Sequence, residues 1–181
     1  MNKKQDRRVK RTQQVLTEAL LKLLSEKDIE RITIQELADV ADVHRSTFYA
    51  HYADIFDLRD QLEAEAIADL TEALSKNSEG SYDDVYNKLI DYLWDHQAIV
   101  KVLFLPKSSS FAQVVTQLLE DRFLAIWKEE EPGIDMEEDV VRYYATFQVG
   151  GFLAAIYRWA KEGFVLSRKE FIRIMNLDEC E

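Results

Sequence analysis

The chain has 181 residues, with five glycines, two prolines and a formal net charge of −11 at pH 7. This length allows one extended domain or two small ones, and the scarcity of glycine and proline favours an all-α fold. No run of about 18 apolar residues occurs, which excludes a membrane-spanning helix. The basic N-terminus lacks the apolar segment of a signal peptide, and one cysteine, Cys180, excludes an internal disulfide. We therefore expect a cytoplasmic protein without a membrane partner.

The acidic excess lies in the second part of the chain. Residues 1–11 carry six basic side chains and one acidic side chain. Residues 1–60 carry 11 of each sign, whereas residues 61–181 carry 12 basic and 23 acidic side chains. This asymmetry favours a basic segment that faces phosphates and an acidic body that lies away from them. The alternative is a solvated basic tail without a partner.

Apolar residues recur at helical spacing along most of the chain, which predicts about nine helices. The expected ranges are 8–25, two short helices within 34–52, and 55–75. Five more helices are expected to begin near residues 81, 98, 111, 136 and 167. Local signals mark several helix ends: caps at Asp54, Ser81, Asp135 and Ser167 (paired with Glu170), and stops at Pro106 and Gly163.

The stretch from Thr33 to Tyr52 predicts two short helices joined by a tight turn. Thr33 is the expected N-cap of the first helix, and Glu36 completes a capping box. Asp42 suits the turn, because aspartate tolerates turn geometry. The first helix has an apolar stripe onto which Val43 and Phe48 fold back, made of Ile34, Leu37, Ala38 and Ala41.

The second helix of this pair is expected to present polar groups to the outside. Phe48 and Tyr52 are assigned to the core, which leaves a face of hydrogen-bonding side chains, Arg45, Ser46, Thr47, Tyr49 and His51. This arrangement is typical of a helix-turn-helix, whose second helix enters the major groove of double-stranded DNA.

The same residues resemble a known family. Two segments are similar to the sequence pattern of the tetracycline-repressor (TetR/AcrR) family of bacterial transcriptional regulators. They are Val43-His44-Arg45-Ser46-Thr47-Phe48-Tyr49 and His51-Tyr52. That pattern has a valine, a short polar run, Thr-Phe-Tyr, one variable residue and His-Phe. Two positions depart from it: Asp42 stands where glycine is usual, and Ile55 stands where many members carry a lysine that holds a phosphate.

The resemblance covers about the first third of the chain and implies a domain organisation. We expect a three-helix helix-turn-helix head over 1–54 and a helical effector-binding and dimerisation bundle over 55–181. The long helix at 55–75 would connect the two.

The candidate DNA contacts divide by their chemistry. Arg45 can grip guanine O6 and N7 together, whereas Ser46 and Thr47 are short enough to bond bases or phosphates. The resemblance assigns phosphate contacts to Tyr49 and His51, and Thr33 would add one at a helix N-terminus. His44 either touches DNA or caps the recognition helix. For Arg45 and His51 the alternative is an ordinary solvent-exposed position on the surface without a DNA contact.

No constellation in the sequence predicts catalysis, a cofactor or a metal. The three histidines, His44, His51 and His96, do not follow a metal-ligand spacing. A nucleophile elbow, a phosphate loop and an HExxH motif are all missing. We therefore expect a protein that is not an enzyme and has no cofactor.

Two further sites are predicted in the body. Aromatic side chains with polar tips can line a pocket for a small, largely apolar effector; the candidates are Trp94, Phe104, Trp127, Tyr143, Phe147 and Gln148. The alternative is that they only form the core. Mid-helix glycines lower helix stability by about 1 kcal/mol each relative to alanine, and close approach of another helix would offset this. Packing within the chain is the alternative to a dimer interface here. With the helices that the resemblance assigns to dimerisation, the interface candidates are Gly150, Gly151, Ala154, Ala155, Phe171 and Ile174.

These observations predict a homodimeric DNA-binding transcriptional regulator. We expect a repressor that a small-molecule effector releases from a palindromic operator. The alternative is an adaptor or co-regulator with the same fold that acts through a protein partner. The sequence identifies neither the effector nor the operator.

Overall fold

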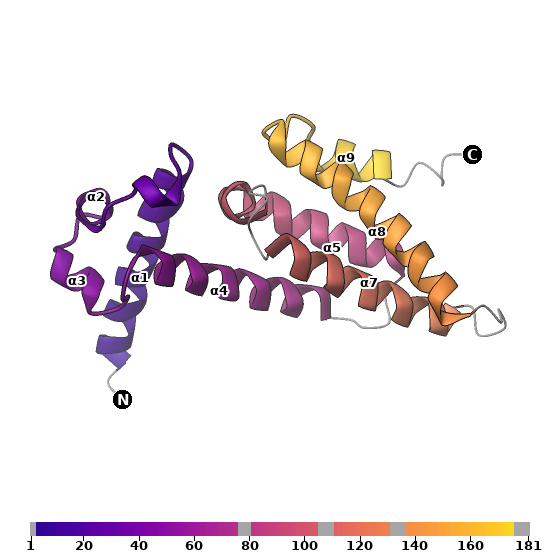
Figure 1. Cartoon of the computed structure of the whole chain (residues 1–181), viewed down its shortest axis with the longest axis horizontal. Helices are drawn as coiled ribbons and strands as arrows, with labels where there is room; N and C mark the ends of the chain where they lie inside the picture. The colour runs from indigo at the N-terminus through magenta and orange to yellow at the C-terminus, as the bar shows by residue number, and fades with distance from the viewer. Residues whose placement is uncertain (1–2, 76–80, 105–110, 131–136, 176–181) are drawn as a thin grey trace. The chain divides into compact units, whose positions relative to one another are not determined.

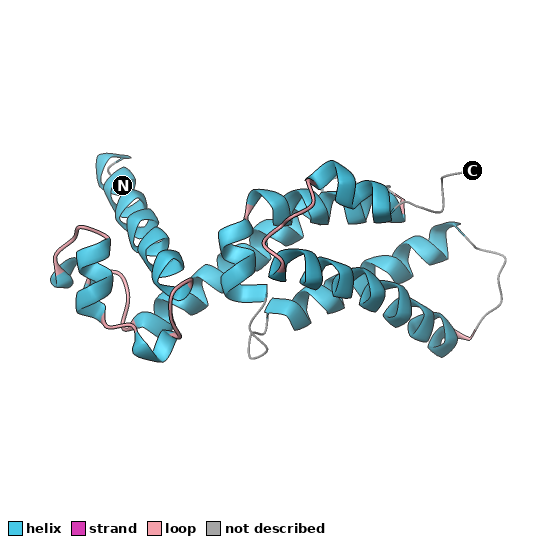
Figure 2. Cartoon of the chain, turned by 90° about the horizontal axis from the view of Figure 1, so that it is seen from above, coloured by secondary structure: helices cyan, strands magenta, loops and turns pink. Residues whose placement is uncertain are grey.

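The computed structural model describes residues 3–75, 81–104, 111–130 and 137–175, and helices fill most of these ranges (Figure 2). The predicted all-α class is confirmed. Figure 1 labels the helices. In chain order they are α1 (Lys3–Leu24), the 3-10 helix η1 (Ile29–Arg31), α2 (Ile34–Val40), α3 (Arg45–Tyr49), α4 (Ile55–Ser75), α5 (Tyr82–Asp95), α6 (Gln97–Ile99), the π-helix η2 (Val100–Phe104), α7 (Phe111–Glu130), α8 (Glu138–Lys161) and α9 (Arg168–Met175).

The chain divides into two compact units, one ending at Ala66 and the other beginning at Ile67. We call the first unit the head and the second the body. The boundary lies within α4, later than the predicted boundary between residues 54 and 55. The reason is that Ile55 and Leu58 are buried in the core of the head. The first turns of α4 therefore belong to the head by packing.

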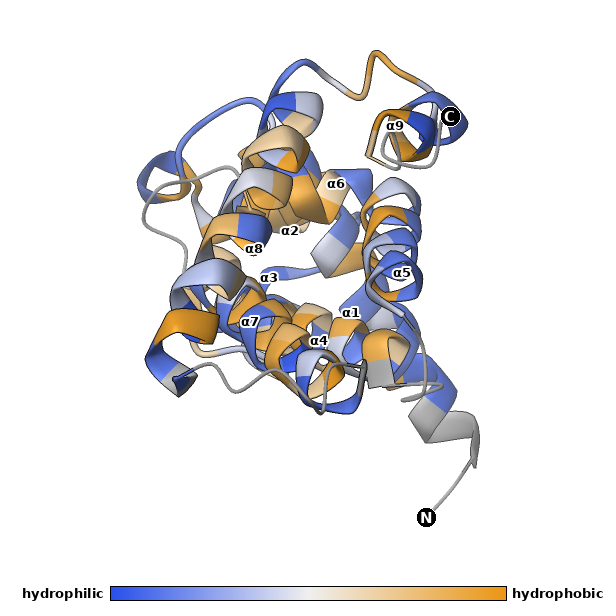
Figure 3. Ribbon diagram, turned by 90° about the vertical axis from the view of Figure 1, so that its right-hand side faces the viewer, coloured by the Kyte–Doolittle hydropathy of each residue, from blue (hydrophilic) through white to orange (hydrophobic). Residues whose placement is uncertain are grey.

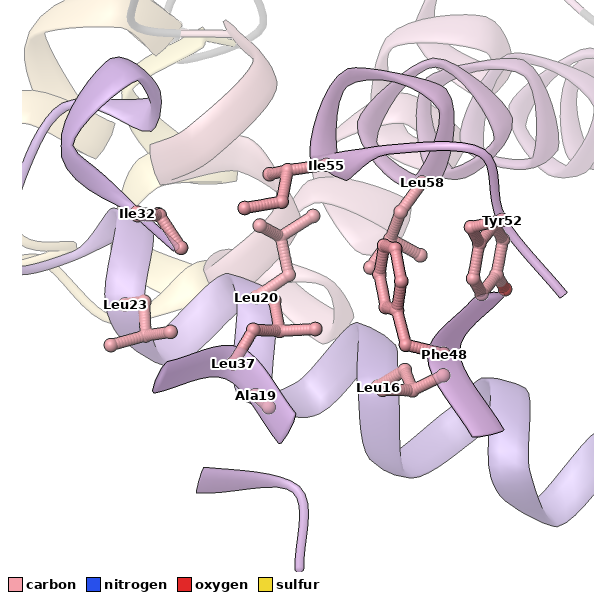
Figure 4. Close-up of a cluster of buried hydrophobic side chains, with 10 residues drawn as sticks. All are labelled: Leu16, Ala19, Leu20, Leu23, Ile32, Leu37, Phe48, Tyr52, Ile55 and Leu58. Carbon is pink, nitrogen blue, oxygen red and sulfur yellow. The ribbon is translucent and has the colours of Figure 1, made fainter. Parts of the chain in front are cut away.

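The core of the head joins α1, α2, α3 and the start of α4 around one apolar cluster (Figure 4). Burial of such side chains is worth about 1.5–3 kcal/mol each, which holds helices as short as α2 and α3 in place. The cluster consists of Leu16, Ala19, Leu20, Leu23, Ile32, Leu37, Phe48, Tyr52, Ile55 and Leu58.

Local capping explains where several helices begin. Thr33 Oγ1 accepts a hydrogen bond from the backbone N–H of Glu36 at 3.2 Å, and Asp54 Oδ1 accepts one from Asp57 at 2.9 Å. Ser81 caps α5. Ser167 and Glu170 bond each other reciprocally before α9, through Glu170 N to Ser167 Oγ at 3.3 Å and Ser167 N to Glu170 Oε2 at 2.8 Å. These predicted caps are confirmed.

In the body, α7 packs along α8, α5 packs against α9, and η2 contacts both α7 and α8. The hydropathy colouring shows hydrophobic and hydrophilic residues mixed around these helices, as amphipathic packing requires (Figure 3). Gly163, with a φ of +81°, follows the end of α8 as predicted. The predicted cap Asp135 and the predicted stop Pro106 lie outside the described residues. Within the described residues, Glu137 is the N-cap of α8.

The helix predicted near residue 98 differs from the expected regular one. The structure has the short α6 followed by the π-helical turn η2. Val100, Leu103 and Phe104 of this turn are buried.

Candidate functional site

The turn between α2 and α3 has the geometry of a helix-turn-helix. Leu37 and Ala38 of α2 are buried, and the backbone N–H of Val43 donates to the carbonyl of Ala38 at 3.0 Å. Asp42 adopts a φ of +52°, in the left-handed region. Aspartate visits this region more readily than most residues, which explains how it replaces the glycine of the family pattern.

One aromatic side chain anchors α3 to the head. Phe48 is 0% exposed and packs on Tyr52, with ring centroids 5.7 Å apart. The predicted core positions of both residues are confirmed. With Phe48 inward, Arg45, Ser46 and Tyr49 are exposed, whereas Thr47 and His51 are half-buried. Five of the residues predicted to contact DNA are therefore at least partly exposed to solvent, on α3 and the turn at its C-terminus.

His44 caps the recognition helix. Its Nδ1 accepts the backbone N–H of Ser46 at 3.2 Å and lies 2.7 Å from Ser46 Oγ. Of the two roles that the sequence left open for His44, capping is the one that these bonds support. The cap also holds the Ser46 hydroxyl beside the imidazole at the start of α3.

Arg45 and Tyr49 contact each other on the outer face of α3. Arg45 Nη2 donates to Tyr49 Oη at 3.0 Å, and the guanidinium carbon lies 5.4 Å from the centre of the Tyr49 ring. The two residues are four apart, the spacing at which helical side chains meet. Arg45, the predicted base contact, and Tyr49, the predicted phosphate contact, are therefore joined by a hydrogen bond.

The N-terminus of α2 carries a charge pair beside Thr33. Lys27 Nζ donates to the Glu36 carboxylate at 2.5 Å, and this bond lowers the pKa of Glu36 below its ordinary value. The pair offsets a carboxylate that would otherwise repel a phosphate at this helix end. Thr33 uses its oxygen as the cap acceptor, so its hydroxyl hydrogen remains a donor.

The basic segment is part of α1. Arg7, Arg8, Lys10 and Arg11 are exposed on this helix. Ile55, which replaces the phosphate-holding lysine of the family pattern, is 6% exposed and packs in the core of the head (Figure 4). Packing therefore takes the place of a phosphate contact at this position.

Residues 80–177, more than half of the chain, match the family model of a TetR-type transcriptional regulator C-terminal region. This chain belongs to the TetR family. It is also 30% identical over 158 residues to an uncharacterized HTH-type transcriptional regulator, YxbF, of Bacillus subtilis (strain 168). That alignment covers 84% of the chain and 40% of YxbF, so the chain spans about two fifths of this relative's length. These matches are to transcriptional regulators and not to enzymes.

Solved structures share the fold of this TetR-family chain. A TetR/AcrR-family transcriptional regulator from Aquifex aeolicus VF5 superposes with a TM-score of 0.75 at 13% identity, over 92% of this chain and 96% of that one. FadR from Bacillus subtilis, in complex with stearoyl-CoA, superposes with a TM-score of 0.67 at 14% identity, over 90% and 96% of the two chains. At these identities the likeness concerns the fold.

The residues predicted to line an effector pocket fall into separate places in the TetR-family body. Trp127 packs near Tyr144, with ring centroids 5.6 Å apart, and Gln148 Nε2 donates to Tyr144 Oη at 2.6 Å. Trp94 stacks instead on Trp159 at 5.5 Å. Phe104 is buried in η2. The predicted set therefore does not form one group.

Tyr143 and Phe147 differ most from their predicted role. They are 80% and 73% exposed, so they do not line an interior cavity of the chain. Both lie on the outer face of α8, whereas Tyr144 is turned about 100° around the helix from Tyr143 and reaches the aromatic rings of α7.

Sequence reasoning missed most of the aromatic residues that gather around Trp127. Tyr82 stacks on Phe123 at 4.5 Å, and Tyr86 stacks on Phe152 at 4.0 Å. Burial raises the pKa of Tyr86. The available signal was the spacing of Tyr82 and Tyr86, which puts both on one face of α5. We call this group the α5–α7–α8 aromatic cluster; its members are Tyr82, Tyr86, Phe123, Trp127, Tyr144 and Phe152.

The predicted interface residues of α8 lie on its outer face. A Cβ added to Gly150 or Gly151 would meet no atom within 4 Å, so packing within the chain does not account for these glycines. Ala154 is exposed and Ala155 is half-buried. Exposed apolar side chains continue this face along the helix; we call it the outer α8 face, made of Val140, Tyr143, Phe147, Gly151 and Ala154.

Phe171 corrects the predicted interface. It is 3% exposed and stacks on Trp159 of its own chain, with centroids 4.1 Å apart. Trp159 Nε1 also donates to the Leu166 carbonyl at 2.9 Å, which fixes the loop before α9. Phe171 therefore joins α9 to α8 within the chain. Ile174 is 43% exposed and stays available for an interface.

Across ranges 3–75, 81–104, 111–130 and 137–175, no helix combines the length and apolar character needed to cross a membrane. The same residues bring together no group of three histidine, cysteine or acidic side chains that could hold a metal ion.

Proposed function

We propose that this chain is a homodimeric repressor that binds a palindromic operator through α3 and is released by a small-molecule effector. The observation that carries the proposal is the construction of α3. Its only fully buried side chain, Phe48, fixes the helix, and the exposed side chains are hydrogen-bonding groups suited to DNA. Such a helix fits the recognition position of a helix-turn-helix.

Each candidate contact has a distinct role in this proposal. Arg45 reads a guanine through its guanidinium, and Ser46 and Thr47 bond groups near the groove floor. Tyr49, His51 and Thr33 hold phosphates, which set the register of the head on the duplex. The exposed cations of α1, including Arg7 and Arg11, add affinity that does not depend on sequence.

The outer α8 face supports the homodimer. Tyr143 and Phe147 expose apolar rings in the two turns before Gly151, and the missing side chain of this glycine lets a second helix approach closely. A second copy offers the same surface, as a two-fold interface requires. The proposed interface consists of this face with Gly150, Ala155 and Ile174. In the dimer the two α3 helices would be about 34–36 Å apart, one turn of DNA, or a multiple of that distance.

The α5–α7–α8 aromatic cluster supports an effector site. Stacked rings with polar tips, such as Tyr144 bonded to Gln148, suit a ligand that is largely apolar with a few polar atoms. FadR, which has the same fold, binds stearoyl-CoA in its solved structure, so long-chain acyl-CoA is a rational first probe. By linkage, an effector that weakens DNA binding is itself bound more weakly when DNA is present.

Selection of duplexes from a randomised library, followed by fluorescence anisotropy, tests the proposal. We expect a palindromic consensus and an affinity whose logarithm falls linearly with the logarithm of salt concentration. Arg45→Ala should weaken binding to the selected duplex by about 1–3 kcal/mol and relax the preference at one base pair. Lys128→Ala on α7 removes an exposed charge from the body and is the matched control. If no duplex is retained at low salt, the alternative of an adaptor acting through a protein partner takes precedence.

A further inference from the structure

We infer that Tyr49 is a positioning residue for Arg45 and so sets which base pair the recognition helix reads. In this inference the phenol is more than a phosphate contact, because it fixes the direction of the guanidinium that reads the base. The inference rests on the proposed function, since it concerns how the same helix selects a DNA sequence.

The geometry ties the guanidinium to the core of the head through two aromatic rings. Arg45 Nη2 donates to Tyr49 Oη at 3.0 Å, and the guanidinium lies over the same ring at 5.4 Å. The Tyr49 ring meets the ring of Phe48 edge-on, at 5.7 Å and 83°. Because Phe48 is fully buried, its orientation fixes the Tyr49 ring, and that ring fixes Arg45.

An arginine side chain without such a contact discriminates less well between base pairs. Its long side chain has many rotamers, and ordering them on binding opposes complex formation. A guanidinium held before binding loses less freedom when it meets a base. It also reaches fewer neighbouring base pairs, so the contact raises selectivity as well as affinity.

The contact with Tyr49 is compatible with reading a guanine. A guanidinium has five N–H donors, and a bidentate bond to guanine O6 and N7 uses two of them. The bond to Tyr49 uses one hydrogen of Nη2, so a complete donor edge remains for the base. The guanidinium can therefore keep its place on Tyr49 while it binds DNA.

Tyr49 can hold a phosphate at the same time. Its hydroxyl accepts the hydrogen bond from Arg45 through a lone pair, and its own hydrogen stays available to donate to a phosphate oxygen. A phosphate bound there would orient the hydroxyl and, through it, Arg45. The backbone register of the duplex and the choice of base are then coupled through one side chain.

Substitution of the tyrosine hydroxyl separates these effects. Binding is measured to the duplex selected by the wild-type protein and to a series in which each base pair of one half-site is changed. Arg45→Ala first identifies the base pair at which its preference is lost. Tyr49→Phe keeps the ring, and we expect it to lower the preference at that same base pair about fivefold, the effect of one hydrogen bond net of solvation. Preferences at the other base pairs stay unchanged.

A double-mutant cycle and a control complete the test. Once Arg45 is replaced by alanine, Tyr49→Phe should no longer change the preference at that base pair, because the residue through which it acts is gone. Tyr157→Phe on α8 removes a phenol hydroxyl from the body and should leave every preference unchanged. Thermal unfolding of Tyr49→Phe should match the wild type, since Tyr49 is 49% exposed.

The outcomes distinguish this inference from the proposed function. If Arg45→Ala lowers the preference at one base pair but Tyr49→Phe weakens all duplexes equally, Tyr49 only holds a phosphate and the inference is overturned. If Tyr49→Phe strengthens binding, the contact competes with DNA, which also overturns it. If the wild type binds no duplex, the proposed function and this inference fail together.

Discussion

Phe48 and Tyr49 are sequence neighbours whose rings meet edge-on at 5.7 Å, one completely buried and the other half exposed. Consecutive side chains on a helix point about 100° apart, so one residue anchors the helix while the next faces outward. The five-residue helix α3 depends on this division, because helices of that length are not stable on their own.

The anchoring role of Phe48 predicts a large loss of stability on truncation. Phe48→Ala should lower the free energy of unfolding by about 3–5 kcal/mol, from lost transfer energy and the cavity left behind. Urea denaturation followed by circular dichroism measures this change. Phe56→Ala on α4 is the matched control: its side chain is 44% exposed, so the loss should be much smaller. Equal losses for the two variants would show that Phe48 does not anchor the head.

The cap on α3 predicts an effect of His44 on stability. His44→Ala removes the acceptor of the Ser46 N–H bond and should lower the free energy of unfolding by about 1 kcal/mol. His44→Asn supplies another capping oxygen and should restore most of that loss. Thermal unfolding of the three proteins measures both changes. An alanine variant as stable as the wild type would mean that the bond contributes nothing in solution.

The outer α8 face predicts that one charge dissociates the dimer. Phe147→Glu places a carboxylate on each side of the two-fold interface, where burial without a partner is unfavourable. We expect sedimentation equilibrium to show monomers at concentrations where the wild type is dimeric. Operator affinity should fall as well, because the two half-sites would be bound independently.

Gln113→Glu is the control for this prediction. Gln113 is exposed on α7, outside the proposed interface, and the substitution adds the same charge. It should leave the dimer intact. A dimer that survives Phe147→Glu would require another interface.

The raised pKa of the Tyr92 phenol predicts that the folded protein loses stability at alkaline pH. Burial raises the pKa of Tyr92 to about 12, and the carboxylate of Asp69 acts in the same direction. The phenol is neutral in both the folded and the unfolded protein below the ordinary tyrosine pKa of about 10. Above that pH the unfolded chain ionises first, so the stability due to the neutral phenol is lost as pH rises through the folded pKa.

Tyr92→Phe should therefore flatten the decrease in stability between about pH 10 and pH 12. The variant keeps a ring that can stack on His96, whose centroid lies 4.2 Å from that of Tyr92. Urea midpoints at a series of pH values measure the slope. Parallel curves for Tyr92→Phe and the wild type would contradict the prediction.

The local sequence was sufficient to predict the helices and most of the residues at which they begin and end. The caps at Thr33, Asp54 and Ser167 bond partners three residues away, so the sequence itself brings donor and acceptor together. The polar face of α3 was predictable for a similar reason. Once Phe48 is inward, helical geometry decides where Arg45 and Tyr49 point.

Packing between helices decided which aromatic side chains are buried and which are exposed, and the local sequence pattern did not predict this. Tyr143 and Tyr144 are the same residue type at adjacent positions, yet Tyr144 meets Phe123 of α7 and Tyr143 is exposed. Phe171 was predicted at an interface but stacks on Trp159. The composition of a helix does not say which neighbour covers each of its faces.

By itself, the sequence determined an all-α chain with a helix-turn-helix head, because helix periodicity and caps act over three or four residues. Only the tertiary structure decided that Tyr82 and Tyr86 join Trp127 in one aromatic cluster and that Phe171 is buried. The physical reason is that burial depends on contacts between segments far apart in the chain, and aromatic side chains are equally suited to a core, a ligand site or an interface.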